Sequence, residues 1–528
     1  MINKLHTLLK PQLIYCILLP LTAISYLLRL FLPEMATASR IFLGLSLLYA
    51  CRPGSLMHSI TMEDSSMPKR LLTALVALVT VAICILPMDQ FPLWNGEIPG
   101  HRNQYELMAE AILDGRIDFA YGDEEKLAGL ENPYDPDERK EAGVYYHWDH
   151  AYYNGKYYMY FGIVPVFLAF LPYRVLTGTA LTTYHATQLF AALTIIGIFA
   201  LFHLLSKLFF KKLPYSVYLA LSVAFSVMSV WYSSAEPALY CTAITAALAL
   251  EIWSIYFFVN AVWGEYSENR SILLAGIGAL LGALVFGCRP PIALANILVL
   301  PMLYAYLRRR KFTLKLLGKL ALAALPYAIV AAALMVYNYA RFEDPFQFGQ
   351  AYQLTVADQS NYKFTLDSAT ILRLFNNTSS NLFGRADIVA TFPYLKHGGV
   401  YWNFPILLLT AAALKTSVRS DMRQKHLTPF LIGLLVTIVI ITALDIMWTP
   451  YLLERYRMDI YFLAGIACFI SVGLWLKHSD EKARNRISTL LMVLAAFTVI
   501  CSFLYCMRTA NVYYPERVKQ IGELLSAK

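Results

Sequence analysis

The sequence has few charged residues and no cysteine motif, and both shortages narrow the class of protein. Asp, Glu, Lys and Arg make up 15% of the 528 residues and hydrophobic residues 58%, whereas soluble domains carry about a quarter charged residues. An ordinary soluble domain is therefore excluded. The eight cysteines lie in or beside apolar segments without CxxC or Cys/His spacing, so neither a disulfide framework nor a zinc site is indicated.

Long apolar runs are what the sequence has in abundance. A membrane-spanning helix needs about 20 mostly apolar residues, and such runs predict an all-α polytopic membrane protein with about 13 transmembrane helices. The first run lacks a small-residue cleavage site, which indicates a retained span rather than a signal peptide. The runs are 12–32, 36–51, 71–88, 186–206, 214–234, 240–262, 272–288, 290–307, 320–340, 399–414, 428–448, 457–476 and 488–507.

The positive charges indicate how the chain is oriented. With Lys4 and Lys10 placed in the cytoplasm, almost every basic cluster falls in loops on that same side, as the positive-inside rule predicts. Topology thus explains the net charge of +9 better than nucleic acid binding does. We expect a multi-pass protein of the plasma (inner) membrane with a cytoplasmic N-terminus. The cytoplasmic loops would be 52–70, 207–212, 263–271, 308–319, 415–427 and 477–487.

Two long loops fall on the opposite, extracytoplasmic side, at about 89–158 and 341–398. The apolar segment 159–176 could span, but that would move the basic cluster at 207–212 outside, and its two prolines disfavour a regular span. We expect a helix at the outer interface instead. The predicted organisation is an N-terminal three-span segment (1–88), a first outer loop with juxtamembrane helices and a hairpin (89–185), central spans (186–340), a second outer loop (341–398) and C-terminal spans with a short tail (399–528).

The first outer loop opens with a predicted amphipathic helix, Gln104 to Leu113, which Asp114-Gly115 ends. Asn103 is a natural N-cap, and Glu106 three residues later completes a pattern like a capping box. The alternative is that Glu106 is a general base, held at a helix start near the membrane. One residue can do both.

An aromatic stretch at 145–162, YYHWDHAYYNGKYYMYFG, ends the same loop. Asn154-Gly155 is the preferred pair for a two-residue type I′ turn, so a hairpin is predicted. In that register Tyr153 lies opposite Lys156 and Tyr152 opposite Tyr157. Strand alternation then puts Asp149 on one face with Tyr153 and Lys156, and puts Trp148 and His150 on the other face with Tyr152.

Two functions fit this stretch. An aromatic belt at the membrane interface explains many tyrosines but does not require an aspartate between histidines. Aromatic rings beside a carboxylate also suit a sugar-binding cleft, in which Asp149 is a second candidate catalytic residue. A metal site made by His147, Asp149 and His150 is weakened, because residues 147 and 150 would lie on opposite strand faces. The candidate substrate-binding residues here are His147, Trp148, His150, Tyr153 and Lys156.

An acidic turn, ENPYDPDERKE, lies between the helix and the hairpin. Asn132-Pro133 and Asp135-Pro136 are strong turn formers. Asp135, Asp137 and Glu138 offer oxygen ligands for a metal, but an exposed acidic turn accounts for them more simply. No metal site is assigned, and the cofactor requirement stays open, with a divalent cation as the alternative.

Four arginines lie at outer membrane edges, against the topological bias of positive charge. Arginine forks suit a phosphate or pyrophosphate at the level of the lipid headgroups. Pairing of Arg455 or Arg457 with Glu454 or Asp459, and snorkelling, are the alternatives. The four candidate phosphate-binding residues are Arg289 in CRPP, Arg341 in YARF, and Arg455 and Arg457 in ERYRMD.

Ionisable residues are few inside the predicted spans, whereas a proton- or ion-coupled transporter usually carries more. Gly278 and Gly282, four residues apart, indicate close helix packing. The ionisable residues are Glu251, Asp445, His185 and His203.

The layout resembles the GT-C superfamily of membrane glycosyltransferases that use polyprenyl-phosphate sugars, and is similar to dolichyl-phosphate-mannose and aminoarabinose transferases. The resemblance covers most of the chain in architecture, through loose motifs. They are NQYELMAEAILDGRIDF, NPYDPDER, WDHAYYNGKYYMYFGIVPVFLAFLPYRVLTG, CRPP, YNYARFEDPFQFG and ERYRMDIYFLAG.

The resemblance implies a mechanism and partners. An acidic residue of the first loop would deprotonate an acceptor hydroxyl, which attacks the anomeric carbon with inversion while outer arginines stabilise the departing lipid phosphate. Members often carry an acidic pair just before the helix, where this chain has His101-Arg102-Asn103-Gln104. Glu106 and Asp149, with Glu97 third, are the substitutes. The implied partners are a polyprenyl-phosphate sugar, membrane lipids, and a cell-envelope glycan, lipid or protein acceptor.

Two other functions stay open at the level of sequence. A catalytically silent relative that binds lipid-linked glycans is motivated by the missing acidic pair. A transporter or flippase of envelope lipids is the second alternative, and scarce intramembrane charge and the lack of an evident internal repeat argue against it.

Overall fold

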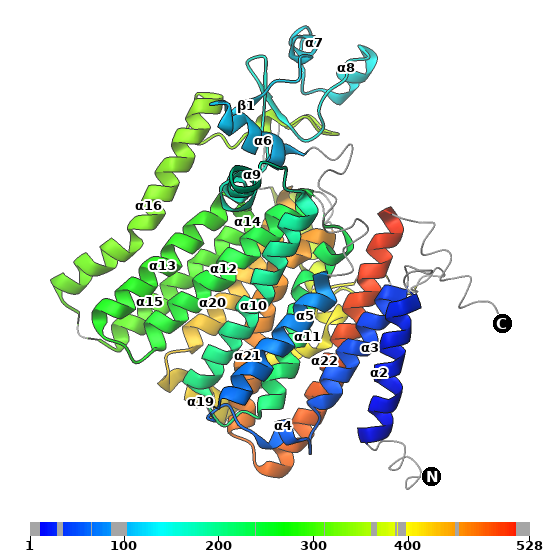
Figure 1. The fold of residues 1–528 in the computed structure, drawn as a ribbon. Helices are drawn as coiled ribbons and strands as arrows, with labels where there is room; N and C mark the ends of the chain where they lie inside the picture. The colour runs from blue at the N-terminus through cyan, green and yellow to red at the C-terminus, as the bar shows by residue number, and fades with distance from the viewer. Residues whose placement is uncertain are drawn as a thin grey trace.

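The computed structural model describes residues 11–28, 35–64, 66–85, 103–237, 239–310, 312–360, 367–385, 388, 396, 398–448 and 454–513. It is an all-α membrane bundle with a small loop domain at one end (Figure 1). In the described ranges, ten helical segments are long and apolar enough to cross a membrane. They are α5 (Met67–Ile85), α10 (Thr183–Phe209), α11 (Tyr215–Ala235), α12 (Leu239–Trp263), α13 (Glu268–Phe286), the continuous run of α14 (Pro290–Ala293), η3 (Leu294–Leu298) and α15 (Val299–Arg308), α16 (Leu314–Phe342), α20 (Thr428–Trp448), η6 (Glu454–Arg457) with α21 (Met458–Lys477), and α22 (Glu481–Tyr513).

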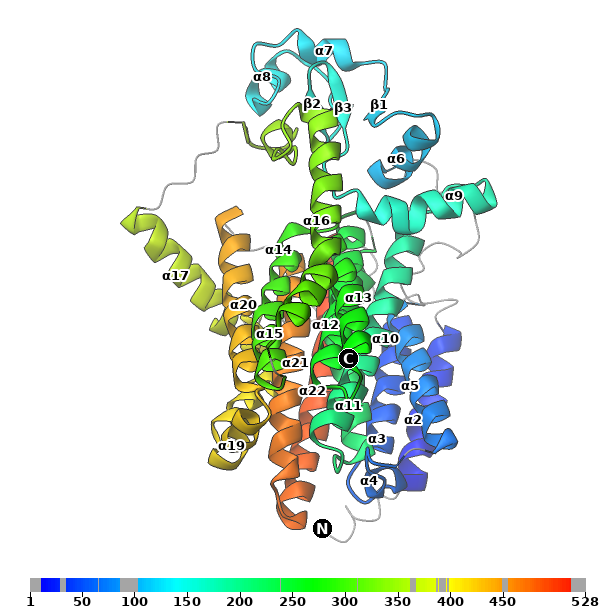
Figure 2. The ribbon, with the colours of Figure 1, turned by 90° about the vertical axis from the view of Figure 1, so that its left-hand side faces the viewer.

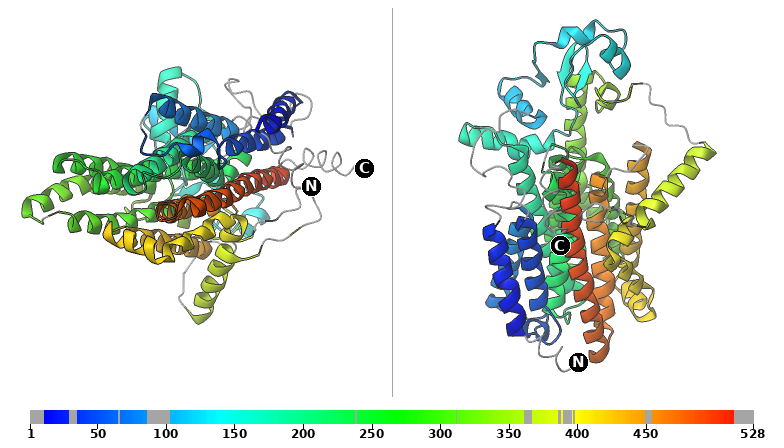
Figure 3. Two further views of the ribbon diagram at one scale, coloured as in Figure 1. Left: turned by 90° about the horizontal axis from the view of Figure 1, so that it is seen from below. Right: turned by 90° about the vertical axis from the view of Figure 1, so that its right-hand side faces the viewer.

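The predicted polytopic membrane fold is confirmed, but three of the expected spans are shorter helices. α2 (Pro11–Leu28) and α3 (Met35–Ala50) pack against each other beside α5 (Figure 3). The segment 399–414 forms α18 (Val400–Asn403) and η5 (Pro405–Leu414). At about 2 Å rise per residue, ten residues of 3₁₀-helix fall short of the roughly 30 Å hydrocarbon layer. Composition alone cannot reveal that shortfall, because η5 is as apolar as a true span.

α11 and α21 occupy the centre of the bundle, where α11 is buried all round. Glycines let α21 approach its neighbours closely. A Cβ at Gly473 would lie 2.5 Å from the ring of Phe210, so only glycine fits there. The ring of Phe202 stacks on Phe469 at 3.9 Å. α16 is the opposite case, because most of its surface is exposed, as expected for a peripheral helix that faces lipid.

The six segments predicted as basic cytoplasmic loops gather at one end of the bundle, here called the basic end. Direct hydrogen bonds join them, and they include α4 (Leu56–Ser59) and α19 (Thr416–Gln424), which lie at the bottom of Figure 1. The predicted basic loops therefore lie together in space, at one end of the bundle. The joined residues are Met62 with Leu213, Lys425 with Phe209, Trp263 with Lys425, Arg309 with Val262, Lys477 with Asp421, and His58 with Asn485.

The opposite end, here called the loop end, carries both long loops. The first loop contains α6 (Gln104–Leu113), β1 (Asp118–Phe119), α7 (Glu124–Ala128), α8 (Pro136–Glu141), β2 (Ala151–Tyr153) and β3 (Lys156–Tyr158). The second loop contains η4 (Gln350–Tyr352) and α17 (Ser368–Phe383). Figure 2 shows these elements above the helices, with α17 slanting away beside α20.

The predicted hairpin is present with the predicted register. Tyr153 pairs with Lys156 and Tyr152 with Tyr157, and β1 adds to β3, giving an antiparallel sheet in the order β1-β3-β2. Asn154 and Gly155 both have positive φ, 48° and 74°. This is the requirement of a type I′ turn, and it explains why Asn-Gly forms it.

The expected alternation of faces before the hairpin is wrong. Asp149 has φ 56°, in the left-handed region, and β2 begins only at Ala151. The chain therefore turns at Asp149 and does not run as a strand. As a result His147 and His150, expected on opposite faces, lie together with ring centroids 5.6 Å apart.

The segment expected at the interface is a short helix and not a span. η2 (Val166–Phe170) and α9 (Leu171–Thr177) form an apolar helix that lies across the top of the bundle (Figure 2). The segment before it is docked by backbone contact, since the amide of Val164 donates to the carbonyl of Gly287 at 2.9 Å. A Cβ at Gly162 would lie 2.2 Å from the same carbonyl oxygen, so this close approach needs glycine.

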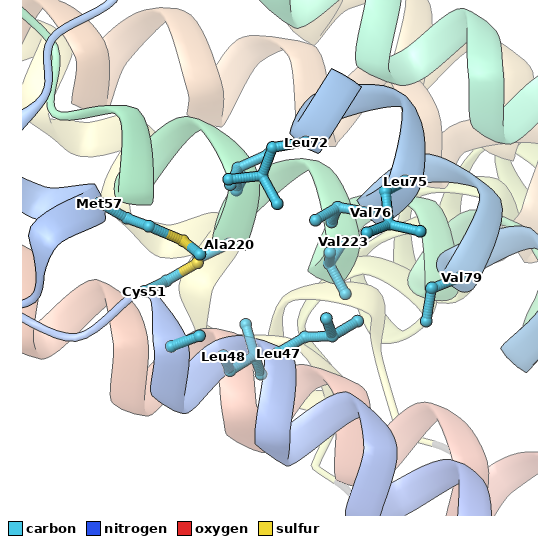
Figure 4. A pocket seen from close by; sticks show the side chains of 12 residues that line it. Leu47, Leu48, Cys51, Met57, Leu72, Leu75, Val76, Val79, Ala220 and Val223 are labelled. Carbon is cyan, nitrogen blue, oxygen red and sulfur yellow. The ribbon is translucent and has the colours of Figure 1, made fainter. Parts of the chain in front are cut away.

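An apolar pocket of about 120 Å³ lies between α3, α5 and α11 (Figure 4). Leu47, Cys51, Met57 and Leu72 are among its lining residues. It contains no titratable group apart from the thiol, and it lies toward the basic end. It therefore belongs to helix packing and not to the candidate site at the loop end.

We predict that Gly162→Ala lowers the free energy of unfolding by about 2 kcal/mol, because the added methyl group meets backbone that cannot rotate away. The measurement is the apparent melting temperature of the detergent-solubilised protein. Gly318→Ala is the matched control: nothing lies within 4 Å of a Cβ there, and alanine in a helix is about 1 kcal/mol better than glycine. Equal melting temperatures for the two variants would contradict the close contact.

Candidate functional site

Asp149 lies at the centre of the polar contacts of the loop end. Its side chain is 5% exposed. One carboxylate oxygen accepts a short hydrogen bond from the Tyr240 hydroxyl at the start of α12, and the other accepts from Gln353 Nε2 at 2.7 Å. A bundle helix and the second loop thus both hold one carboxylate of the first loop.

The backbone of Asp149 is fixed as firmly as its side chain. Its amide donates to the carbonyl of Leu354 at 2.9 Å, and the amide of Leu354 donates to the carbonyl of His150 at 2.9 Å. Gln104, the first residue of α6, donates to the carbonyl of Asp149 at 2.7 Å. The amide of Tyr160 donates to the same Gln104 side chain at 3.0 Å. These bonds hold the left-handed turn at Asp149 in place.

Two arginines of the bundle lie beside the rings of Tyr240 and Tyr456. The guanidinium of Arg455 lies 4.2 Å from the ring centroid of Tyr240 and 5.5 Å from that of Tyr456. The guanidinium of Arg289 lies 4.7 Å from the Tyr456 ring centroid, and its Nε bonds both oxygens of Asp459, at 3.0 and 2.7 Å. The sequence alternative that paired Asp459 with Arg455 or Arg457 gives way to a pair with Arg289.

Opposing effects act on the pKa of Asp149. Burial raises the pKa of this carboxyl group above its ordinary value, and the hydrogen bonds from Tyr240 and Gln353 partly offset that shift. The positive charge of Arg455 and the indole of Trp148 also favour the ionised form. A raised pKa brings a carboxylate closer to the range in which it exchanges protons near neutral pH.

Glu106 lies in the first turn of α6, two residues after Gln104. The predicted helix α6 is confirmed, and Asn103 caps it by accepting from the amides of Tyr105 and Glu106 at 3.1 and 3.4 Å. Glu106 is 8% exposed. Its neighbour Tyr105 is fully buried. Gln104 links α6, the helix that carries Glu106, to the backbone of Asp149. Glu97, the third acidic candidate, lies outside the described residues.

The two histidines belong to an aromatic cluster in the loop domain. His147 stacks on Tyr121 with ring centroids 3.5 Å apart, and its Nε2 lies 3.3 Å from an oxygen of Asp123. His150 bonds the carbonyl of Trp148 at 2.9 Å and the hydroxyl of Tyr121 at 2.8 Å. Burial lowers the pKa of His150 to about 4, so it is neutral at pH 7. These contacts join both histidines to Tyr121, and His147 also to Asp123, within the same loop.

The remaining predicted residues are distributed around the site. Trp148 is 47% exposed beside Asp149, which leaves its ring open to a ligand. Tyr153 packs on Tyr352, with ring centroids 4.6 Å apart, and Lys156 is exposed, 3.8 Å from Asp118. Tyr153 thus faces η4 and Lys156 faces β1, and among the described residues no hydrogen bond, ion pair or ring contact joins either side chain to Asp149.

Arg341 and Arg457 lie apart from the Arg289 and Arg455 pair. Arg341 is buried and donates to the carbonyl of Met159 at 2.7 Å and to Asn338 at 2.7 Å. It therefore ties the end of β3 to α16. Arg457 donates to Asn381 of α17 at 3.2 Å and contacts a different set of helices.

Metal ligation has little support among the described residues, where no three His, Cys, Asp or Glu side chains lie together. The acidic turn is used locally. Asp135 caps α8 by accepting from the amide of Asp137 at 2.8 Å, and Glu138 accepts from the amides of Glu131 and Asn132 at 2.7 and 3.0 Å. These carboxylates hold backbone amides.

Four residues of the site are absent from the predicted functional residues. Tyr240, Gln353, Gln104 and Tyr456 hold or flank Asp149 and the arginines. Gln104 and Tyr456 lie in stretches that carry the family resemblance, Tyr240 is a polar aromatic residue at the start of a predicted span, and Gln353 has no local signal. Chemically, the arrangement offers a buried carboxylate to receive a proton and two guanidinium groups to stabilise negative charge.

Comparison with known proteins gives one structural match. No protein-family model and no curated protein matches the sequence. Among solved structures, the chain is similar to the archaeal oligosaccharyltransferase AglB from Archaeoglobus fulgidus, in complex with an inhibitory peptide and a dolichol-phosphate. The sequence identity is 13% and the TM-score 0.42. The match covers 84% of this chain and 56% of AglB, so the chain spans little more than half of that protein's length.

We predict a pH dependence of stability that arises from His150. The pKa of this group falls from about 6.5 in the unfolded chain to about 4 in the folded protein, so the unfolded state binds the proton first as pH falls. Stability is full above pH of about 6.5 and declines by up to about 3 kcal/mol as pH falls toward 4. The measurement is the apparent melting temperature between these pH values. His150→Gln lacks this titration, and parallel curves for wild type and variant would contradict the assignment.

Proposed function

We propose that the protein is an integral-membrane glycosyltransferase that transfers a sugar from a polyprenyl-phosphate donor to a cell-envelope acceptor. The observation that carries the proposal is the meeting of a buried carboxylate, Asp149, with the guanidinium of Arg455 across the ring of Tyr240. In this proposal the protein lies in the plasma (inner) membrane with its N-terminus in the cytoplasm. The loop end then faces outward, where envelope acceptors are found.

Arg289 and Arg455 are suited to bind the phosphate of the donor. Arg455 forms no hydrogen bond or ion pair with any residue in the described parts of the chain, and Arg289 uses only its Nε in bonding Asp459. The guanidinium groups of both arginines lie by the ring of Tyr456. Two such groups side by side can hold a phosphate and stabilise the charge that it gains on leaving.

Asp149 is the candidate general base. It takes the proton of the acceptor hydroxyl, the acceptor oxygen forms a bond to the anomeric carbon, and the bond from that carbon to the phosphate oxygen breaks, which inverts the configuration. The electron pair leaves with the lipid phosphate. A base with a pKa near the working pH is the most effective one, and burial moves Asp149 in that direction. Glu106 is the second candidate, and Trp148 offers an exposed ring for stacking on the sugar.

A silent lipid-glycan-binding protein is the second candidate function. Both oxygens of Asp149 already accept hydrogen bonds, from Tyr240 and Gln353. A carboxylate held in this way could serve as an acceptor for a bound sugar hydroxyl without taking its proton. Transfer of sugar distinguishes the two functions directly.

We expect Asp149→Asn to lower the rate of sugar transfer by about 100-fold or more, because loss of a general base costs 10²–10⁴-fold. Arg455→Gln should lower it by about 10- to 100-fold through loss of charge stabilisation. The assay is transfer of radiolabelled sugar from a polyprenyl-phosphate donor to envelope acceptors by the purified protein. Glu125→Gln, an exposed carboxylate of α7, is the matched control and should keep wild-type activity.

The same assay decides which acid acts. Full activity in both Asp149→Asn and Glu106→Gln would contradict the proposed site. No transfer by the wild type with any acceptor, together with retained donor binding, would support the silent binding protein instead.

Tyr240→Phe should shift the acidic limb of the pH profile of kcat/KM upward by about one unit, since a hydrogen bond to a charged group contributes about 1.5–3 kcal/mol. The Tyr240 hydroxyl favours the ionised form of Asp149, so its loss raises the pKa of the base. A higher pH is then needed to ionise Asp149. Tyr145→Phe, at an exposed tyrosine of the same loop, is the control. A limb that stays in place or moves down would exclude Asp149 as the titrating base.

A further inference from the structure

Arg455 and Arg457 both belong to the 3₁₀-helix η6, but their side chains contact different neighbours. Arg455 contacts Tyr240 of α12 beside Asp149. Arg457, two residues later, donates from Nη2 to Asn381 of α17 at 3.2 Å. The two guanidinium groups therefore serve separate places, and only the first has been assigned to the donor phosphate.

The guanidinium of Arg457 is buried and largely unpaired. Its side chain is 8% exposed, and neither Nε nor Nη1 has a hydrogen-bond partner. No carboxylate forms an ion pair with it in the parts of the chain that the structure describes. A buried charge without a partner costs several kcal/mol, which an anion bound at this position would offset.

Two buried hydroxyl groups lie on helices next to this guanidinium. Thr378 lies three residues before Asn381 on α17, on the same helix face, and its buried Oγ1 has no hydrogen-bond partner. The hydroxyl of Tyr461, four residues after Arg457 on α21, is also buried. The charge of Arg457 acts on Tyr461 and on Tyr505 of α22, as does that of Glu454 from the same turn. A guanidinium with free donors, next to a helix that carries an unpaired hydroxyl, is a donor set that a phosphate group takes.

Exposed apolar side chains lie on the helix that carries this cluster. α17 packs on α20 and α18, and it slants away from the bundle toward its N-terminal end (Figures 2 and 3). Ile371, Leu372 and Phe375 of α17 are 54, 60 and 70% exposed. A molecule that places an anionic group at Arg457 would therefore lie with its remaining part along apolar side chains.

We propose that Arg457, Thr378, Asn381 and Tyr461 form a second lipid site, which binds the phosphate of an anionic membrane lipid between α17 and α21. This site is separate from the donor site at Arg289 and Arg455. It goes beyond the proposed transfer reaction and does not depend on it. The lipid neutralises the buried guanidinium and fixes the C-terminal end of α17 against the bundle.

The test is native mass spectrometry of the purified full-length protein with phosphatidylglycerol or phosphatidylcholine of the same acyl chains. The wild type should bind phosphatidylglycerol about tenfold more tightly, a preference of the size expected for one charge-assisted contact. Arg457→Gln should abolish the preference, and Thr378→Val should reduce it a few-fold. Lys140→Gln, which removes the charge of an exposed lysine of α8 outside both arginine sites, should leave it unchanged.

Each other outcome overturns the proposal. An unchanged preference in Arg457→Gln excludes the site, and an equal loss in Lys140→Gln and Arg457→Gln shows a general effect of charge. Displacement of the lipid by millimolar inorganic phosphate alone would mean that a free anion, and not a lipid, occupies the site.

If Arg457→Gln does not fold, Arg457→Lys, which keeps the charge, and Thr378→Val carry the test: the first should keep the preference and the second should reduce it. These readouts require no transfer activity, so failure of the proposed function leaves them interpretable.

Discussion

The turn at Asp149 is the constraint on which the loop end depends. One residue in the left-handed region is hydrogen-bonded to α6, to α12 and to the second loop: its amide donates, and its carbonyl and carboxylate accept. A non-glycine residue in this conformation costs about 1 kcal/mol or more, and each hydrogen bond returns about 1 kcal/mol. The surroundings therefore outweigh the strain, and the cost is tolerated where the backbone must present a carboxylate to the bundle.

Arginine placement is the second organising feature. Asp459 neutralises Arg289 through Nε alone, which orients the guanidinium and keeps its other donors available. Arg455 is held by aromatic faces, which attract a cation without consuming its hydrogen-bond donors. Arg341, by contrast, donates to Met159 and Asn338 and acts as a structural tie. Arginines that the sequence places alike, at the outer ends of predicted spans, thus differ in whether their N–H groups remain free.

Local sequence signals predicted local structure well. The apolar runs, the α6 helix with its Asn103 cap, the Asn154-Gly155 hairpin and the gathering of basic loops follow from hydropathy, capping, turn chemistry and charge. The alternation around Asp149 failed because tertiary hydrogen bonds hold a positive φ at this residue, which aspartate tolerates better than most residues but which its neighbours in the sequence do not require. Tyr240 and Gln353 were missed for a related reason. Each becomes part of the site only when segments far apart in the chain meet, and no spacing in a single sequence encodes that meeting.

The contribution of Gln353 and Leu354 to the Asp149 turn has an evolutionary consequence. The side chain that bonds the carboxylate lies 204 positions further along the chain, in a loop that tolerates insertions and substitutions more readily than a helix does. Variation in the second loop can therefore retune the proton affinity of a residue in the first without altering the bundle. Chains that differ only in the length of this loop would differ in the hydrogen bonding of that carboxylate while their helices stay the same.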